Sequence, residues 1–323
     1  MRDQYSGDVS DLLKFALLRA LAADDKTIGV AWYYNPEHDG RLQDGRHREY
    51  RDESKWTGLD LPLFSALKEL RQRTVRALEE LPIWPPKTRF HRSPVPPARN
   101  RRSWSVDMKN RLREANIVFL DPDNGVGAAN ERHATWEEIA ALRQPDRALV
   151  LITFPKRENH DLQVEKHHHL LRAQTGAASL LTVRTCVSVE IVNRRGRIPR
   201  NRWFTIVDAD DSLIERAKQF VGNLNGIENC KADMVRAREY SETTEARITI
   251  SNAAIAESLQ RPSSYSHATH GTEPVKKMCP ECGHLFKGRG FDGIDAHWRA
   301  KHEAIMPYTE AWPLVKSGGY HRR

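Results

Sequence analysis

The sequence predicts an α/β fold, a Rossmann-like and mostly parallel sheet with helices on both faces, plus a small C-terminal zinc finger. Short apolar runs at 28–34, 117–120 and 148–154 alternate with segments of helical periodicity. Continuous apolar strands separated by helices are typical of a parallel sheet that is covered on both faces. The finger is predicted by cysteines and histidines at metal-ligand spacing near the C-terminus.

The expected elements follow in order along the chain. Leucines at helical spacing predict a helix over 11–23, with Asp8 or Ser10 as its N-cap. Further helices are expected over 61–80 and 135–142. The late runs 187–192 and 203–207 flank a polar, arginine-rich turn, which predicts an antiparallel hairpin at the end of the sheet.

A change in composition near residue 240 predicts the domain boundaries. Residues 251–273 are rich in Ser, Ala, Thr and His and poor in large apolar side chains, as flexible linkers are. We therefore expect a Rossmann-like catalytic domain over 1–240, a flexible linker over 241–275, a zinc finger over 276–305 and a basic tail over 306–323.

Bulk composition limits the class of protein. The 323 residues contain 39% hydrophobic and 29% charged residues, and they include no apolar run of the roughly 20 residues that a membrane helix needs. The opening residues lack the apolar region of a secretory signal. We expect a cytoplasmic protein with no membrane partner. The sequence does not determine its oligomeric state. Its net charge of +8 favours a polyanionic partner.

The C-terminal ligand set is Cys279, Cys282, His297 and His302, in the spacing Cys-x2-Cys-x14-His-x4-His. Thiolate and imidazole ligands suit tetrahedral Zn²⁺, and so short a unit cannot bury enough core without the metal. Phe286 and Ile294 occupy the apolar positions between the two ligand pairs, so the segment resembles the C2H2 zinc-finger family. The resemblance implies a structural zinc ion.

The helix of this finger is expected to bind without reading sequence. The positions that contact bases in the family carry short side chains here, which cannot make bidentate bonds to base edges; they are Gly290, Asp292, Gly293 and Ala296. Nearby basic residues could still hold phosphates, namely Lys287, Arg289, Arg299 and Lys301. Non-specific nucleic-acid docking is favoured, with sequence reading and protein contact as alternatives.

Three polar segments of the large domain carry candidate site residues. The first enters the first helix with Asp8, Asp11 and Lys14. The other two follow predicted strands, where ligands bind in open α/β sheets; they contribute Asn35 and Asp39, then Asp121, Asp123 and Asn124.

The order Gly-x-x-x-Asp-x-x-Lys, strand, acidic loop and strand-Asp-Pro is similar to the 23S ribosomal RNA adenine-N6 methyltransferase family. The resemblance places Gly7, Asp11 and Lys14 in the opening turn, and Asp121 and Pro122 where a flipped adenine is received. That family binds S-adenosylmethionine on a glycine-rich loop. Here 34–40 lacks closely spaced glycines, and 121–124 lacks the aromatic that stacks on the base. S-adenosylmethionine is therefore not expected.

The segments 34–40 and 121–124 carry acidic and amide side chains instead of the family's glycines and aromatic. Asp39, Asp121, Asp123 and Asn124 could activate water or stabilise an oxocarbenium ion, as in cutting a flipped base from its sugar. The strand-Asp-Pro-x-x-Gly pattern is similar to the water-activating motif of uracil-DNA glycosylases. DNA base excision is the leading hypothesis. The alternatives are phosphodiester cleavage with Mg²⁺ held by the same carboxylates, adenine methylation, and non-catalytic DNA binding.

Two cationic strips favour nucleic acid as partner, with DNA ahead of RNA. Residues 87–102 contain no acid, and an extended cationic loop with nearby tryptophans suits phosphate tracking and base stacking; Arg99, Arg101 and Arg102 are its candidate contacts. The hairpin turn provides Arg194, Arg195 and Arg197, with Arg200 and Arg202 following.

Overall fold

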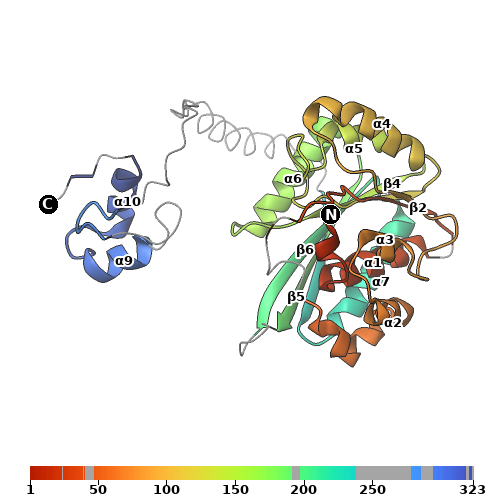
Figure 1. Cartoon of the computed structure of the whole chain (residues 1–323), viewed down its shortest axis with the longest axis horizontal. Coiled ribbons are helices and arrows are strands. Elements are labelled where there is room, and N and C mark those ends of the chain that lie inside the picture. Colours follow the sequence, from red (N-terminus) through yellow and green to blue (C-terminus); the bar gives the residue numbers. More distant parts are fainter. Residues whose placement is uncertain are drawn as a thin grey trace. The chain divides into compact units, whose positions relative to one another are not determined.

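The computed structural model describes residues 1–23, 25–38, 40, 47–190, 197–237, 278–284, 294–317 and 320–321. The chain forms two compact units, Met1–Ile250 and Ser251–Arg323 (Figure 1). The predicted linker, 241–275, lies outside the described residues. No described helix has the length and apolarity needed to cross a membrane.

The large unit contains a seven-stranded sheet in the order β2-β1-β3-β4-β6-β5-β7. Its first four strands pair in parallel, and the remaining pairs are antiparallel. The α/β prediction is confirmed, although only one half of the sheet is parallel. The strands are β1 (Ile28–Ala31), β2 (Arg89–His91), β3 (Ile117–Leu120), β4 (Ala148–Thr153), β5 (Leu180–Glu190), β6 (Arg197–Val207) and β7 (Cys230–Arg236). The predicted hairpin is β5–β6, and both strands are longer than the apolar runs indicated.

Helices cover both faces of this sheet (Figure 1). Alternate strand residues point to opposite faces, so Ile117 and Phe119 join one core while Val118 and Leu120 join the other. The first core is completed by α1 (Val9–Ala22), α2 (Leu61–Glu69), α3 (Val75–Glu79) and α7 (Asp211–Asn225). The second is completed by α4 (Arg101–Arg111), α5 (Trp136–Leu142) and α6 (His160–Thr175).

Local capping explains where several helices begin. Asp8 caps α1 by accepting a hydrogen bond from the Ser10 amide, as predicted. Thr135 and Glu138 form a capping box at the start of α5. The single helix predicted over 61–80 is wrong. Leu70 leaves the helical conformation and Thr74 caps a new helix, which divides the segment into α2 and α3.

The second unit has its own core around Trp298 of α9 (Ile294–Lys301). The segment predicted as a basic tail contains α10 (Tyr308–Ser317), and Met306, Ala311 and Val315 pack in the same core. The buried Tyr320 hydroxyl donates to Glu281 at 2.7 Å. The folded module therefore extends well beyond residue 305.

Candidate functional site

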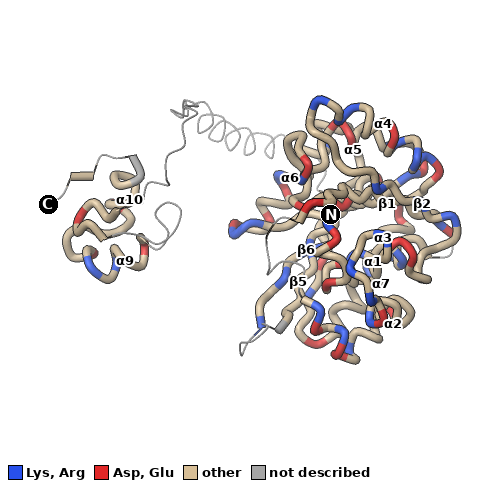
Figure 2. The backbone as a smooth tube through the Cα atoms, viewed as in Figure 1, with Lys and Arg blue, Asp and Glu red and all other residues tan. Residues whose placement is uncertain are grey.

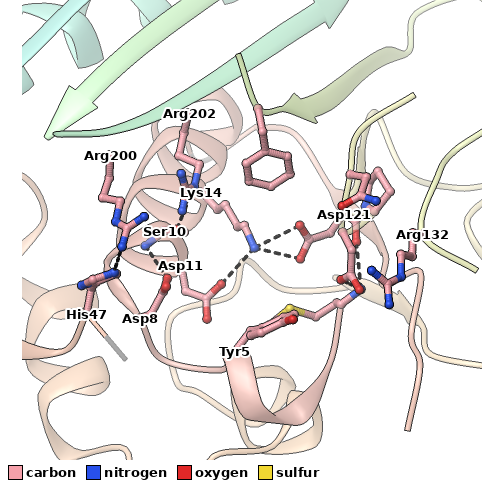
Figure 3. Close-up of a pocket in the computed structure, with 15 residues that line it drawn as sticks. Tyr5, Asp8, Ser10, Asp11, Lys14, His47, Asp121, Arg132, Arg200 and Arg202 are labelled. Carbon is pink, nitrogen blue, oxygen red and sulfur yellow. Dashed lines mark hydrogen bonds and ion pairs between the residues drawn. The ribbon is translucent and has the colours of Figure 1, made fainter. Parts of the chain in front are cut away.

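A cavity of about 210 Å³ opens where the amino end of α1 faces the carboxyl end of β3. It brings together six of the candidate residues from the three polar segments, Asp8, Asp11, Lys14, Asp121, Asp123 and Asn124 (Figure 3). The strand order reverses between β1 and β3: the chain adds β2 on one side of β1, and then β3 and β4 on the other side. Such switch points are the ordinary ligand sites of open α/β sheets.

Lys14 is the centre of a buried ion cluster. Its Nζ lies 3.1 Å from Oδ1 of Asp11, one turn earlier on α1, and 3.0 Å from the carboxylate of Asp121. The three residues are 5%, 1% and 2% exposed. Burial raises the pKa of Asp11 to about 6, although Lys14 opposes the shift. Burial alone would lower the pKa of Lys14, but Asp121 and Asp11 raise it overall, so the lysine is an ammonium at neutral pH.

Gly7 holds Asp11 in this cluster. Its amide donates to Oδ2 of Asp11 at 2.7 Å. The backbone has a φ of +78°, and a Cβ at this position would lie 2.8 Å from the Arg51 guanidinium and 2.9 Å from the Leu70 side chain. Any other residue would therefore strain the backbone and collide with its neighbours. The opening turn needs glycine at this position.

Asp123 and Asn124 also line the cavity. Oδ1 of Asp123 is 2.7 Å from the Met1 nitrogen, and Oδ2 is 3.3 Å from Nε of Arg2. Both carboxylate oxygens are thus paired, while Asn124 is exposed. Asn35 is not part of the cavity, because its side chain accepts the Glu37 amide in a local turn. Asp39 lies outside the described residues.

Phe154 supplies an aromatic surface that the sequence interpretation missed. It follows β4 directly, is 37% exposed and lines the same cavity as Asp121 and Pro122. The Arg202 guanidinium carbon lies 5.0 Å from the centre of its ring. Residues 121–124 themselves contain no aromatic side chain. The position of Phe154 directly after the next parallel strand could have indicated it, because the carboxyl ends of neighbouring parallel strands meet at one edge of the sheet.

Basic side chains form another part of the cavity wall, beside Met1, Tyr5 and Ser10. Arg200 and Arg202 are two residues apart on β6 and so share one face of the strand. His47 and Arg132, also missed from sequence, complete the basic lining. Arg197 does not line the cavity, and its guanidinium donates to the Ser188 carbonyl at 2.8 Å. Arg194 and Arg195 lie outside the described residues.

Arg101, which the sequence suggested as a phosphate contact, is buried and paired with Glu138. Its Nε lies 2.5 Å from Oε1 of Glu138, and its guanidinium packs against the rings of Tyr33 and Trp104. The side chain is only 6% exposed. Its ion pair with Glu138 is one of the contacts that hold α4 beside α5. Arg99 and Arg102 are exposed and remain candidates. Figure 2 shows Lys and Arg interspersed with acids along the large unit.

The second unit brings its four predicted ligands into one cluster. The ligand atoms of Cys279, Cys282, His297 and His302 all lie within 4.8 Å of one another. Nε2 of His297 is 3.2 Å from Sγ of Cys282 and 3.3 Å from Nε2 of His302. Two nitrogens bound tetrahedrally to one zinc ion lie about 3.4 Å apart. The donor set and its spacing fit a structural zinc ion.

The surface of this unit is described only in part. Ile294 is buried in the core, as the C2H2 pattern predicts. The guanidinium of Arg299 lies over the Tyr308 ring at 5.5 Å, while Ala296 and Lys301 are exposed. The other positions named for the finger lie outside the described residues; they are Phe286, Lys287, Arg289, Gly290, Asp292 and Gly293.

Comparisons with known proteins give no assignment. No family model matches the chain, and no curated protein matches it. One similar solved structure is the crystal structure of protein LPL1258 from Legionella pneumophila, of the DUF519 family. It is 13% identical, covers 72% of this chain and 98% of that chain, and has a TM-score of 0.38. A likeness at that score carries no functional argument.

Proposed function

We propose that the large unit transfers a methyl group to the amino group of a nucleic-acid base, with adenine as the base. The observation that carries the proposal is the 3.0 Å contact between Lys14 and Asp121. These residues belong to the two motifs by which the sequence resembles the adenine-N6 methyltransferases, and they are 107 positions apart. Their direct contact supports a shared site.

The cavity suits an unstacked base. Asp121 and Pro122 offer polar atoms to its edge, and Phe154 offers an exposed ring to its face. Arg132, Arg200 and Arg202 on the same wall can hold flanking phosphates. Enzymes that act on a base remove it from the stack and read its edge in a pocket of this kind. Phe154 thereby supplies the stacking surface that 121–124 lacks.

The sequence gives no expectation of S-adenosylmethionine binding, because 34–40 lacks closely spaced glycines, but the charges of the Lys14 cluster suit this methyl donor. S-adenosylmethionine supplies an electrophilic methyl group on a sulfonium cation, beside an amino acid group. Asp8 and Asp11 would attract its positive charges and Lys14 its carboxylate. Lys14 also orients the carboxylate of Asp121, which can accept a hydrogen bond from the base amine. The proton that the methylated amine then loses can pass to water.

Hydrolytic base excision is the second candidate, because Asp123 and Asn124 also line the cavity. It ranks lower since Asp121 is paired with Lys14, and Asp123 with Met1 and Arg2. A carboxylate paired with a cation is a weaker base toward water. The same pairing weighs against these carboxylates as ligands of Mg²⁺.

For the second unit, we propose that the Cys2His2 cluster holds Zn²⁺ and that the module docks on nucleic acid without reading sequence.

A single assay separates these chemistries. DNA and RNA strands are incubated with the protein, with and without S-adenosylmethionine, and methylated nucleosides, abasic sites and strand breaks are scored separately. We expect methyladenine only with the donor. Phe154→Ala should lower the rate about 10-fold to 100-fold through lost stacking, while Leu162→Ala, an exposed apolar residue on α6 outside the cavity, should not. Abasic sites formed without donor would instead establish hydrolysis.

A further inference from the structure

A group of polar side chains lines the cavity on the side of Lys14 opposite Asp121 (Figure 3). It consists of His47, Arg200, Arg202 and Ser10, called here the His47–Arg200–Arg202 cluster. Ser10 lies in the first turn of α1, and the Val9 amide donates to the His47 carbonyl at 2.9 Å. The β6 arginines and His47 are thus held against the start of α1.

The hydrogen bonds within the cluster leave donors without acceptors. A guanidinium can only donate, so the contact of Arg200 with Nε2 of His47 makes Nε2 the acceptor. Burial and Arg200 lower the pKa of His47, so its ring is neutral and Nδ1 carries the hydrogen. His47 is only 9% exposed. Among the described residues, neither Nδ1 of His47 nor Nε of Arg200 has a hydrogen-bond partner.

Ser10 and Asp8 also line this side of the cavity. Nε of Arg202 donates to Oγ of Ser10 at 2.9 Å, which leaves the hydroxyl hydrogen of Ser10 able to donate to another group. Asp8 is the acid on this side of the cavity, and its carboxylate is engaged as the N-cap of α1. In the described part of the chain, Arg200 has no carboxylate within ion-pairing distance.

We infer that the His47–Arg200–Arg202 cluster binds a backbone phosphate of the nucleic-acid substrate, the one beside the base that enters the Lys14 cavity. Two guanidinium groups with a neutral N–H and a hydroxyl match the several acceptor oxygens of a phosphodiester. An acceptor is also what the buried donors lack, since an unsatisfied buried donor is costly. Arg202 lies over Phe154, so phosphate and base would be positioned together. The inference rests on the proposed function only in taking nucleic acid as the ligand.

The test measures binding of single-stranded oligodeoxyadenylate by fluorescence anisotropy over a range of salt concentrations. Arg200→Gln with Arg202→Gln should weaken binding about 10-fold to 100-fold. It should also reduce the slope of log affinity against log salt by about 0.7, the value for one phosphate on a single strand. His47→Gln, a milder variant, should weaken binding without changing the slope. The matched control is Arg76→Gln with Arg113→Gln, whose side chains are 71% and 75% exposed and outside the cavity.

A second probe removes the phosphate charge instead of the protein charge. With uncharged methylphosphonate linkages in the oligonucleotide, the Arg200→Gln/Arg202→Gln variant and the wild type should bind alike. The inference is overturned if the double variant keeps the slope of the Arg76→Gln/Arg113→Gln control, or if its defect persists on the uncharged strand. Circular dichroism and thermal melting establish that each variant is folded.

Failure of this inference can be told apart from failure of the proposed function. The phosphate subsite is read from DNA affinity and salt slope, which need no methyl donor. Methyl transfer is read from the nucleoside products. A reduced slope with no methylated base in any variant keeps the subsite and removes the proposed reaction. An unchanged slope with methylated base formed at the wild-type rate does the opposite.

Discussion

The proposed zinc module (279–302) and the Lys14 cavity bring their side chains together over different lengths of chain. Four ligands within 279–302 meet in one cluster, whereas Lys14 meets an aspartate 107 positions away. The spacing of the four ligands is set by one turn and one helix, so the ligand set can be recognised from a short stretch of sequence. The cavity exists only after the sheet has brought β3 beside α1. The two regions should therefore respond differently to the loss of one side chain.

The largest effect is expected in the zinc module. Cys279→Ser removes one of four ligands, and so small a unit depends on its metal for folding. The variant should lose its zinc and expose the second unit to protease, while the large unit keeps its melting transition. Zinc content by mass spectrometry and limited proteolysis measure both. Zinc retained at one equivalent would contradict the assignment.

A buried charge of the large unit should matter without unfolding it. Arg101→Ala leaves the buried Glu138 carboxylate without its cationic partner, with only the Tyr33 hydroxyl and the Thr135 amide donating to it. This should cost about 3–5 kcal/mol in the free energy of unfolding. Arg102→Ala, its exposed neighbour on the same helix, should change stability by less than about 0.5 kcal/mol. Urea denaturation of both variants makes the comparison. Equal losses would contradict the structural role given to Arg101.

The Lys14 cluster should also affect stability through pH. The folded-state pKa of Asp11 is raised to about 6 from 3.8, so its protonated form favours folding. This stability is fully present below pH 3.8 and is lost as pH rises through 6. The loss amounts to about 3 kcal/mol. Asp11→Asn cannot titrate, so its stability relative to wild type should improve between pH 4 and pH 7. A constant difference across that range would show that Asp11 titrates normally.

The exposed arginines of η4 (Ala98–Asn100) and α4 should give the smallest effect. Arg99→Gln with Arg102→Gln should lower the salt slope for duplex DNA by about 1–2 units if both contact phosphates. This pair replaces the triple substitution that the sequence alone would suggest, because Arg101 is structural. A slope equal to that of wild type would place this surface outside the binding face.

These contrasts explain what could be predicted from sequence. The zinc ligands, the Asp8 cap and the strand-end acids follow from local spacing and apolar pattern. Phe154 and His47 enter the site from separate segments, so no local motif indicated them. Arg101 looked like a surface cation, because composition does not distinguish an arginine paired with Glu138 from one in solvent. The break near Thr74 was missed since the apolar periodicity continues through it.

Isothermal titration calorimetry with S-adenosylmethionine tests the central claim most directly, because the proposed methyl transfer needs the donor to bind in the cavity that Lys14 lines. We predict binding of one molecule to the wild-type protein with a micromolar dissociation constant. Lys14→Ala should weaken this binding at least tenfold through the lost charge pairing, and Arg76→Gln/Arg113→Gln should leave it unchanged. Binding heats that are absent from wild type, or that are equal in wild type and Lys14→Ala, would contradict the claim.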